Sequence, residues 1–144
     1  MPKNYEYIVS ACLCGEKARY DGKANTVEKV KQLINEGRAI MICPEIEGGL
    51  PVPRHPCEIQ NNKVINNIGE DKTSEFRKGA NKALQLCKKY NIKKAILKEK
   101  SPSCGSKCIY FGETFTKTLI TGQGITAKLL IENGIEVISD EDFV

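Results

Sequence analysis

The chain has 144 residues, a length that suits one domain with a buried core. Its 40% hydrophobic and 28% charged residues exclude disordered and collagen-like proteins. The net charge is only +4 and the lysines are interspersed with acidic residues, so a nucleic acid is not the expected partner.

The N-terminal third predicts two strands and one helix. Residues 5–11 are nearly continuous in apolar and β-favouring side chains, which is typical of a buried strand. Residues 25–36 repeat apolar side chains with helical spacing and stop at Gly37, a common helix terminator. Residues 39–42 predict a second buried strand.

The segment 43–71 is rich in glycine and proline, and we predict an irregular loop of functional importance there. Thr73 is the expected N-cap of the helix that follows. The second half of the chain adds these elements: a helix over 71–90, a strand over 94–98, a second loop over 99–123, a helix over 124–132 and a strand over 136–138.

Strands that alternate with helices favour a parallel sheet, because parallel neighbours need crossover connections. We therefore predict an α/β fold: a three-layer, Rossmann-like domain with a small, mainly parallel sheet and helices on both faces. No linker or repeat is visible, so residues 1–144 are expected to form a single domain. The pattern leaves the strand order open.

Seven cysteines are many for a chain of this size, and their number is odd. No signal peptide or membrane-spanning stretch is visible, so we expect a cytoplasmic protein. Thiols stay reduced in that compartment, and metal binding or catalysis is therefore favoured over a disulfide framework.

Three of the cysteines follow predicted strands. Cys12 and Cys43 come directly after the first and second strands, and Cys104 comes a few residues after the third. Because the carboxyl ends of parallel strands share one edge of the sheet, we expect these three thiols to meet there.

Converging thiolates favour zinc, copper(I) or an iron–sulfur cluster as their ligand. Structural zinc is often held by close C-x-x-C pairs, which this chain lacks. A [4Fe-4S] cluster bound by three cysteines would keep one iron open as a Lewis acid. Three buried structural cysteines are the alternative, since free cysteine is often a small core residue.

Five short motifs follow one another along the chain: Val9-Ser10-Ala11-Cys12-Leu13-Cys14-Gly15, Arg19-Tyr20-Asp21-Gly22, Cys43-Pro44-Glu45-Ile46-Glu47-Gly48-Gly49-Leu50, Pro53-Arg54-His55-Pro56-Cys57-Glu58 and Ser101-Pro102-Ser103-Cys104-Gly105. As a set they resemble the signatures of the thiouracil desulfidase family, and the match covers nearly the whole chain. The resemblance implies a [4Fe-4S] cluster held by Cys12, Cys43 and Cys104. It also implies non-redox removal of sulfur from thiolated uracil.

The resemblance assigns catalytic roles to Glu45, which follows Cys-Pro, and to Ser101. In the mechanism that we hypothesise, the open iron binds the thiocarbonyl sulfur and Glu45 acts as general base on water. Ser101 would orient the water or the ring, and sulfur would leave as hydrosulfide. The candidate substrate-binding residues are Ser10, Gly48, Gly49 and Ser103.

Each of these residues also has a structural interpretation. Glu45 could cap a helix or pair with an arginine, Ser101 could be an ordinary loop serine, and Gly48 and Gly49 could make a turn.

Two arginines in the motifs could bind a substrate carbonyl or phosphate. Pairing within the chain is the favoured assignment, of Arg54 with Glu58 and of Arg19 with Asp21.

Of the remaining cysteines, Cys87 lies on the inward face of its helix and is predicted to pack in the core. Cys57 is also predicted to be structural, whereas Cys14 and Cys108 are fallback ligands. His55 lies between two prolines and is expected to be an exposed residue rather than a metal ligand.

The sequence departs from the family pattern at Cys14, Phe111 and Lys72, which leaves the ligand set intact and the exact thiolated base open. The expected substrate is a small thiolated pyrimidine or its nucleoside. A thiolated nucleotide or tRNA base is a third possibility, and the absence of a basic stripe makes the free base or nucleoside preferable. We expect a monomer or homodimer. The alternative function is a non-catalytic iron–sulfur or zinc-binding module in sulfur delivery or redox sensing.

Overall fold

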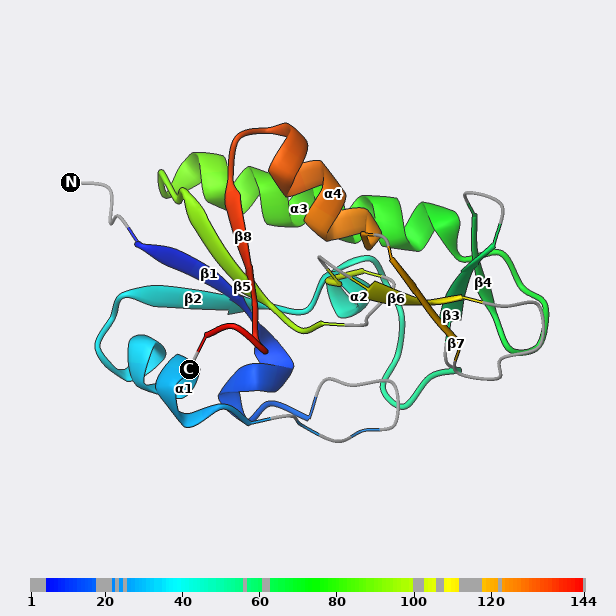
Figure 1. The fold of residues 1–144 in the computed structure, drawn as a ribbon, viewed down its shortest axis with the longest axis horizontal. Helices are drawn as coiled ribbons and strands as arrows, with labels where there is room; N and C mark the ends of the chain where they lie inside the picture. The colour runs from blue at the N-terminus through cyan, green and yellow to red at the C-terminus, as the bar shows by residue number, and fades with distance from the viewer. Residues whose placement is uncertain are drawn as a thin grey trace.

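The computed structural model describes residues 5–17, 22, 24, 26–55, 57–60, 63–99, 103–105, 108–111, 118–121 and 123–143. Its central layer is a four-stranded sheet in which all strands run parallel, in the order β2-β1-β5-β8 (Figure 1). These strands are β1 (Tyr7–Ser10), β2 (Ala39–Ile42), β5 (Lys94–Leu97) and β8 (Glu136–Ser139). The chain adds β2 on one side of β1 and then returns to add β5 on the other, which creates the crevice where α/β sheets bind ligands.

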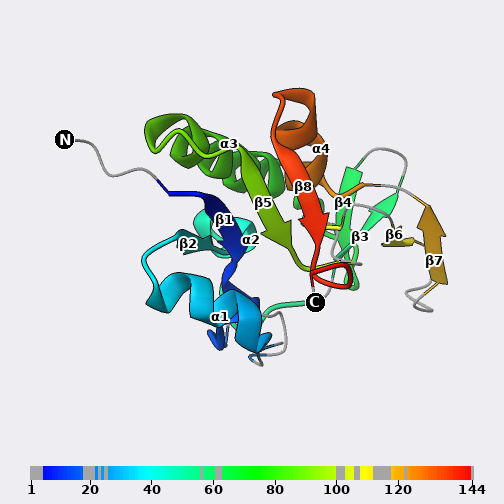
Figure 2. The ribbon, with the colours of Figure 1, turned by 60° about the vertical axis from the view of Figure 1, so that its left-hand side comes forward.

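Helices cover both faces of this sheet (Figure 2). One face packs against α3 (Thr73–Lys89) and α4 (Ile125–Glu132), and the other packs against α1 (Glu28–Asn35). Successive β1 side chains point to opposite faces, so Ile8 joins the core under α3 and α4 while Val9 joins the core under α1. The predicted three-layer α/β fold is therefore confirmed.

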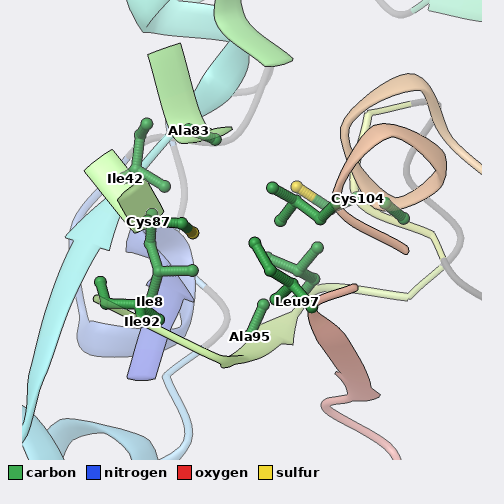
Figure 3. Packing of buried hydrophobic residues seen from close by; sticks show 11 residues of the cluster. Ile8, Ile42, Ala83, Cys87, Ile92, Ala95, Leu97 and Cys104 are labelled. Atoms are coloured by element: carbon green, nitrogen blue, oxygen red, sulfur yellow. The ribbon is translucent and has the colours of Figure 1, made fainter. Parts of the chain in front are cut away.

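The core under α3 and α4 contains two of the cysteines. Cys87 and Cys104 lie among aliphatic side chains such as Ile42 and Leu97 (Figure 3). The predicted core position of Cys87 is confirmed, since it is 2% exposed.

The two predicted loops are wrong in part, because they contain a second sheet. Its strands are β3 (Cys57–Gln60), β4 (Lys63–Asn66), β6 (Cys108–Phe111) and β7 (Thr118–Thr121), in the order β4-β3-β6-β7. Two antiparallel pairs are joined by the parallel pair of β3 with β6. The strands β3 and β4 carry polar residues such as Glu58 and Asn66, so they lack the continuous apolar run that marks the equally short strands of the parallel sheet.

Two one-turn helices follow strands of the parallel sheet directly. The 3-10 helix η1 (Ala11–Cys14) follows β1, and α2 (Pro44–Glu47) follows β2. The first of these shortens the predicted strand 5–11, because Ala11 already belongs to η1. The second corrects the predicted loop 43–71 at its start, since Pro44 is favourable at the first position of a helix.

The start of α3 also differs from the prediction. Lys72 occupies the N-cap position, and Thr73 is the first helical residue. The Thr73 hydroxyl accepts the Val64 N–H at 2.9 Å and donates to Asp71 Oδ1 at 2.6 Å. Thr73 therefore ties the helix to β4 rather than capping it.

None of the helices that the structure describes combines the length and the apolarity needed to cross a bilayer.

Candidate functional site

The three predicted ligand cysteines lie beyond the carboxyl ends of three adjacent strands. Cys12 belongs to η1 after β1, Cys43 is the N-cap of α2 after β2, and Cys104 follows β5. The three strands run in the same direction in Figure 1. Because β1 lies between β2 and β5, the three segments that carry the thiols leave the sheet along one edge.

The electrostatics of Cys104 show that the three thiols are neighbours. Burial raises the pKa of the Cys104 thiol well above its usual range, since the side chain is 5% exposed. Negative charge on Cys43, on Cys12 and on Glu45 raises that pKa further. Such effects fall with distance, so the structure gathers these groups at one place. Their role as metal ligands stays a prediction.

Ser10 links β1 to β5 beneath these thiols. Its Oγ accepts the Lys98 N–H at 3.0 Å, and its side chain also forms a hydrogen bond with Cys104 that lowers the pKa of that thiol. The residue is buried. Ser10 thus favours the thiolate form of Cys104, and its predicted contact with substrate stays a prediction.

Cys43 is surrounded by backbone donors because it begins a helix. Burial raises the pKa of its thiol, while hydrogen bonds from the backbone N–H groups of Ile46 and Glu45 lower it. Charge adds two opposed effects, with Glu45 raising the pKa and Arg54 lowering it. Donors of this kind stabilise negative charge on the sulfur atom, either in a free thiolate or in a thiolate bound to a metal.

The helix α2 that carries Cys43 and Glu45 is held against α3 by direct backbone contact. A Cβ atom on Gly48 would overlap the carbonyl group of Glu75, and a Cβ atom on Gly79 would overlap that of Pro44. Glycine is therefore needed at both positions for the two helices to approach so closely. Packing explains the presence of Gly48, and its predicted contact with substrate stays a prediction.

Gly49 follows this contact at the surface of the molecule. It is exposed and has a φ of +103°, a conformation that favours glycine. A substrate-binding role for Gly49 also stays a prediction.

Glu45 forms an ion pair with Arg54. Arg54 Nε donates to Glu45 Oε1 at 3.1 Å, with the side chains 4% and 16% exposed respectively. Burial raises the pKa of the Glu45 carboxyl group, and the nearby guanidinium opposes that rise. The predicted pairing of Arg54 with Glu58 is therefore corrected, because the loop after α2 brings Arg54 to Glu45.

Ser103 is fully buried, and its Oγ lies 2.8 Å from Thr126 Oγ1. Its carbonyl oxygen accepts the backbone N–H groups of Thr126 and Ala127 in the first turn of α4. The positive end of the α4 dipole therefore lies beside the Cys104 segment. Ser101 lies outside the described residues, as do Arg19 and Asp21.

The other cysteines and the histidine have ordinary surroundings. Cys14 is buried under α1, and Cys57 is buried beside Val64, so burial raises the pKa of these thiols to about 11 and about 12 respectively. His55 is exposed as predicted. The side chain of Cys108 lies outside the described part.

The sequence did not predict the burial of Glu58 on β3. Its side chain is 3% exposed, Oε2 has no hydrogen-bond partner among the described residues, and burial raises its pKa. The signal that was available is the alternation along residues 57–66, which is interrupted by the turn-favouring pair Asn61-Asn62 and is typical of a hairpin.

The donor set at the thiol edge fits an iron–sulfur cluster. Among the described residues, no group of three His, Cys, Asp or Glu side chains is arranged to hold a single metal ion. Three thiols with N–H and O–H donors beside two of them suit a cluster.

Comparisons with known proteins agree with this geometry. The chain is 43% identical to the Bacillus subtilis (strain 168) protein named uncharacterized protein YbbK, over 94% of this chain and 95% of that one. It is 46% identical to a solved structure described as [4Fe-4S]-dependent thiouracil desulfidase TudS, with a TM-score of 0.90 over 96% of this chain and 92% of that one. The family model described as 2-thiouracil desulfurase matches residues 7–142, which include all three predicted ligand cysteines. The chain therefore belongs to the 2-thiouracil desulfurase family.

Proposed function

We propose that this protein is a [4Fe-4S]-dependent desulfidase acting on thiolated uracil or a related thiolated base or nucleoside. Substrate and water would give the oxygen-containing base and hydrosulfide, with no change of redox state. The observation that carries the proposal is the gathering of Cys12, Cys43 and Cys104 at one sheet edge. The family and the likeness to TudS, whose description names both the cluster and the reaction, support it.

Cys12, Cys43 and Cys104 would hold the cluster. When bound, the cluster supplies a Lewis-acid iron that has no protein ligand and can polarise a thiocarbonyl group. The surrounding donors assist by stabilising charge on sulfur: the Ser10 side chain at Cys104, and two backbone N–H groups at Cys43.

Glu45 would take the proton from the attacking water. Its carboxyl group is separated from Cys43 by Pro44 alone, and its charge acts on Cys104. Burial moves its pKa upward from the ordinary value, towards the range in which a general base works best. The ion pair with Arg54 fixes the orientation of the carboxylate.

The contacts with substrate are proposed for the remaining residues of the motifs. Ser101 would orient the water or the ring, and Ser10, Gly48 and Gly49 would border the ring. Ser103 is buried against Thr126, so it would act by shaping the loop at Cys104.

The test is anaerobic reconstitution of the wild type and of Cys12→Ala, Cys43→Ala and Cys104→Ala. The wild type should bind iron and sulfide, show the broad visible absorbance of a cluster, and release hydrosulfide from thiouracil. Each variant should lose both the absorbance and the activity. Cys87→Ala is the control, because Cys87 lies on α3 rather than after a strand of the parallel sheet and is not a predicted ligand, although it shares a core cluster with Cys104; it should keep both.

Glu45→Gln tests the general base separately. It should keep the visible spectrum and lose about 100-fold or more in turnover, since general-base catalysis contributes that much. Glu47→Gln is its control on the same helix, because Glu47 is half-exposed and pairs only loosely with Lys82 at 3.7 Å. Full turnover in Glu45→Gln would exclude the proposed role.

A protein that holds the cluster and turns over no thiolated base would instead be the non-catalytic module. We further expect the enzyme in the cytoplasm, where thiols stay reduced, as a monomer or homodimer. Chromatography with light scattering checks the oligomeric state.

A further inference from the structure

The fourth strand of the parallel sheet ends at the same edge as the three strands that lead to the predicted ligand thiols. β8 runs parallel to β5, with Ser139 in register with Leu97, and the two strands lie side by side in Figure 2. Asp140 is the first residue beyond β8, and its backbone N–H donates to the Leu97 carbonyl at 3.0 Å. This strand therefore contributes a carboxylate at the edge where the other strands contribute thiols, and the proposed function assigns it no role.

The Asp140 carboxylate fixes the chain just beyond β5. Its Oδ1 accepts the Glu99 N–H at 2.7 Å, and its Oδ2 lies 3.8 Å from Lys98 Nζ. Lys98 Nζ in turn donates to the Glu99 carbonyl oxygen at 3.3 Å. The carboxylate thus holds the N–H of Glu99 directly and the carbonyl group of the same residue through a lysine. The Asp140 side chain is only 13% exposed, and hydrogen bonds to a charged group in such surroundings are strong ones.

The same short segment contacts Ser10, which contacts a predicted ligand. The Lys98 N–H donates to Ser10 Oγ at 3.0 Å, and the Ser10 side chain forms its hydrogen bond with Cys104. A hydroxyl group has one hydrogen to donate. Because the Lys98 N–H occupies a lone pair of the oxygen, that hydrogen is directed to the Cys104 sulfur atom. Ser10 is 3% exposed, so the contact is shielded from bulk water.

We propose that Asp140 is a positioning residue for Cys104, acting through the end of β5 and the Ser10 hydroxyl. The carboxylate fixes the peptide groups of Lys98 and Glu99, and the Lys98 N–H sets the direction of the Ser10 hydroxyl. Hydrogen bonds to a ligand sulfur raise the reduction potential of an iron–sulfur cluster, because they stabilise the added negative charge of the reduced form. The effect on the cluster rests on the proposed function, whereas the anchoring of the segment after β5 does not.

The anchoring is tested by amide hydrogen exchange in the metal-free protein. Asp140→Ala removes the acceptor of the Glu99 N–H, whereas Asp140→Asn keeps an oxygen there, and both variants lack the negative charge. The Lys98 amide should exchange about 10-fold faster in Asp140→Ala than in Asp140→Asn, since the loss of one such hydrogen bond has an effect of that size. The amides of β5 are the internal reference, because a general loss of stability would speed their exchange as well. Equal exchange of the Lys98 amide in the two variants would overturn the proposal.

The effect on the cluster is tested by the reduction potential of the reconstituted protein. Ser10→Ala removes the donor and should shift the potential to a more negative value. Asp140→Ala should have a more negative potential than Asp140→Asn, and the comparison cancels the effect of the lost charge, which acts in the opposite sense. Glu136→Gln removes an exposed charge at the other end of β8, so it is the control and should keep the wild-type potential.

Double variants decide whether Asp140 acts through Ser10. In a protein that already carries Ser10→Ala, Asp140→Ala and Asp140→Asn should have the same potential, since no hydroxyl group remains to be directed. A difference that persists in that background would overturn the proposal, as would equal potentials of the two variants when Ser10 is present. If the potentials do not move while hydrosulfide is released, this proposal falls and the proposed function stands. If the protein binds no cluster, the proposed function falls, and the exchange of the Lys98 amide still decides the anchoring.

Discussion

The two sheets of this protein differ in how they are stabilised and in what they carry. The parallel sheet lies between two layers of helices, and its central residues Ile8, Val9 and Ile96 are fully buried. The second sheet packs one face on α3 through Val64 and Phe76. The segments that carry the predicted ligand thiols follow strands of the first sheet, whereas the second sheet borders the cavity lined by Arg54, Cys57 and Asn66. The deeply buried parallel sheet therefore positions the proposed cluster, while β3 and β4 of the second sheet border a cavity.

Shortening an apolar side chain in each sheet tests this contrast and should give the largest change in the free energy of unfolding. Ile96→Ala should lower the free energy of unfolding by about 3–4 kcal/mol, because it empties a fully buried site. Ile65→Ala in β4 should lower it by about 1 kcal/mol, since that side chain is only half-buried. Urea unfolding measures both. Equal losses would show that the two sheets contribute alike.

Gly79→Ala tests the contact between α3 and α2 and should have a smaller effect. Alanine favours a helix over glycine by about 1 kcal/mol, but its Cβ would overlap the Pro44 carbonyl. We expect a net loss of about 1–2 kcal/mol in unfolding free energy, together with weaker cluster retention, because α2 carries Cys43. Lys78→Ala, one residue away on the exposed face, should change stability by less than about 0.5 kcal/mol. A Gly79→Ala protein more stable than the wild type would contradict the close approach.

A substitution of Asp71, which lies beside β4, should give the smallest effect, and only in the way that stability depends on pH. Hydrogen bonds from the Thr73 hydroxyl and N–H lower the pKa of Asp71 below its ordinary value. A carboxylate whose pKa is lower in the folded state stabilises the fold above its unfolded pKa, and that stability is lost as the pH falls through the folded pKa. Asp71→Asn should therefore lose less stability than the wild type between neutral pH and about pH 3. Thermal midpoints across this range check it, and parallel curves for the two proteins would refute it.

The sequence predicts the parallel sheet well and the second sheet poorly, for a physical reason. A buried parallel strand needs apolar residues on both faces, so residues 39–42 give a continuous signal and match β2 fully. The strands β3 and β4 carry polar residues such as Glu58 and Asn66, so the prolines before them dominate the pattern. The pairing of β3 with β6, which is distant in the sequence, cannot be inferred from local propensity.

The candidate site follows the same division. The positions of Cys12, Cys43 and Cys104 could be predicted, because each follows the end of a strand and the pattern of apolar residues predicts the strands. The pairing of Arg54 with Glu45 depends on the path of a proline-rich loop, and the sequence favoured Glu58 instead. Charge alone cannot choose between two acids when both are within reach along the chain.

The contact of α2 with α3 has a consequence for redesign of the protein. Backbone atoms, rather than interlocking side chains, set how closely these helices lie at Gly48 and Gly79. Residues that line the cavity beside β3 and β4, apart from Arg54, can therefore be exchanged without moving the turn that presents Cys43. Libraries that keep the two glycines and Arg54 and vary only these positions would leave the predicted cluster site in place.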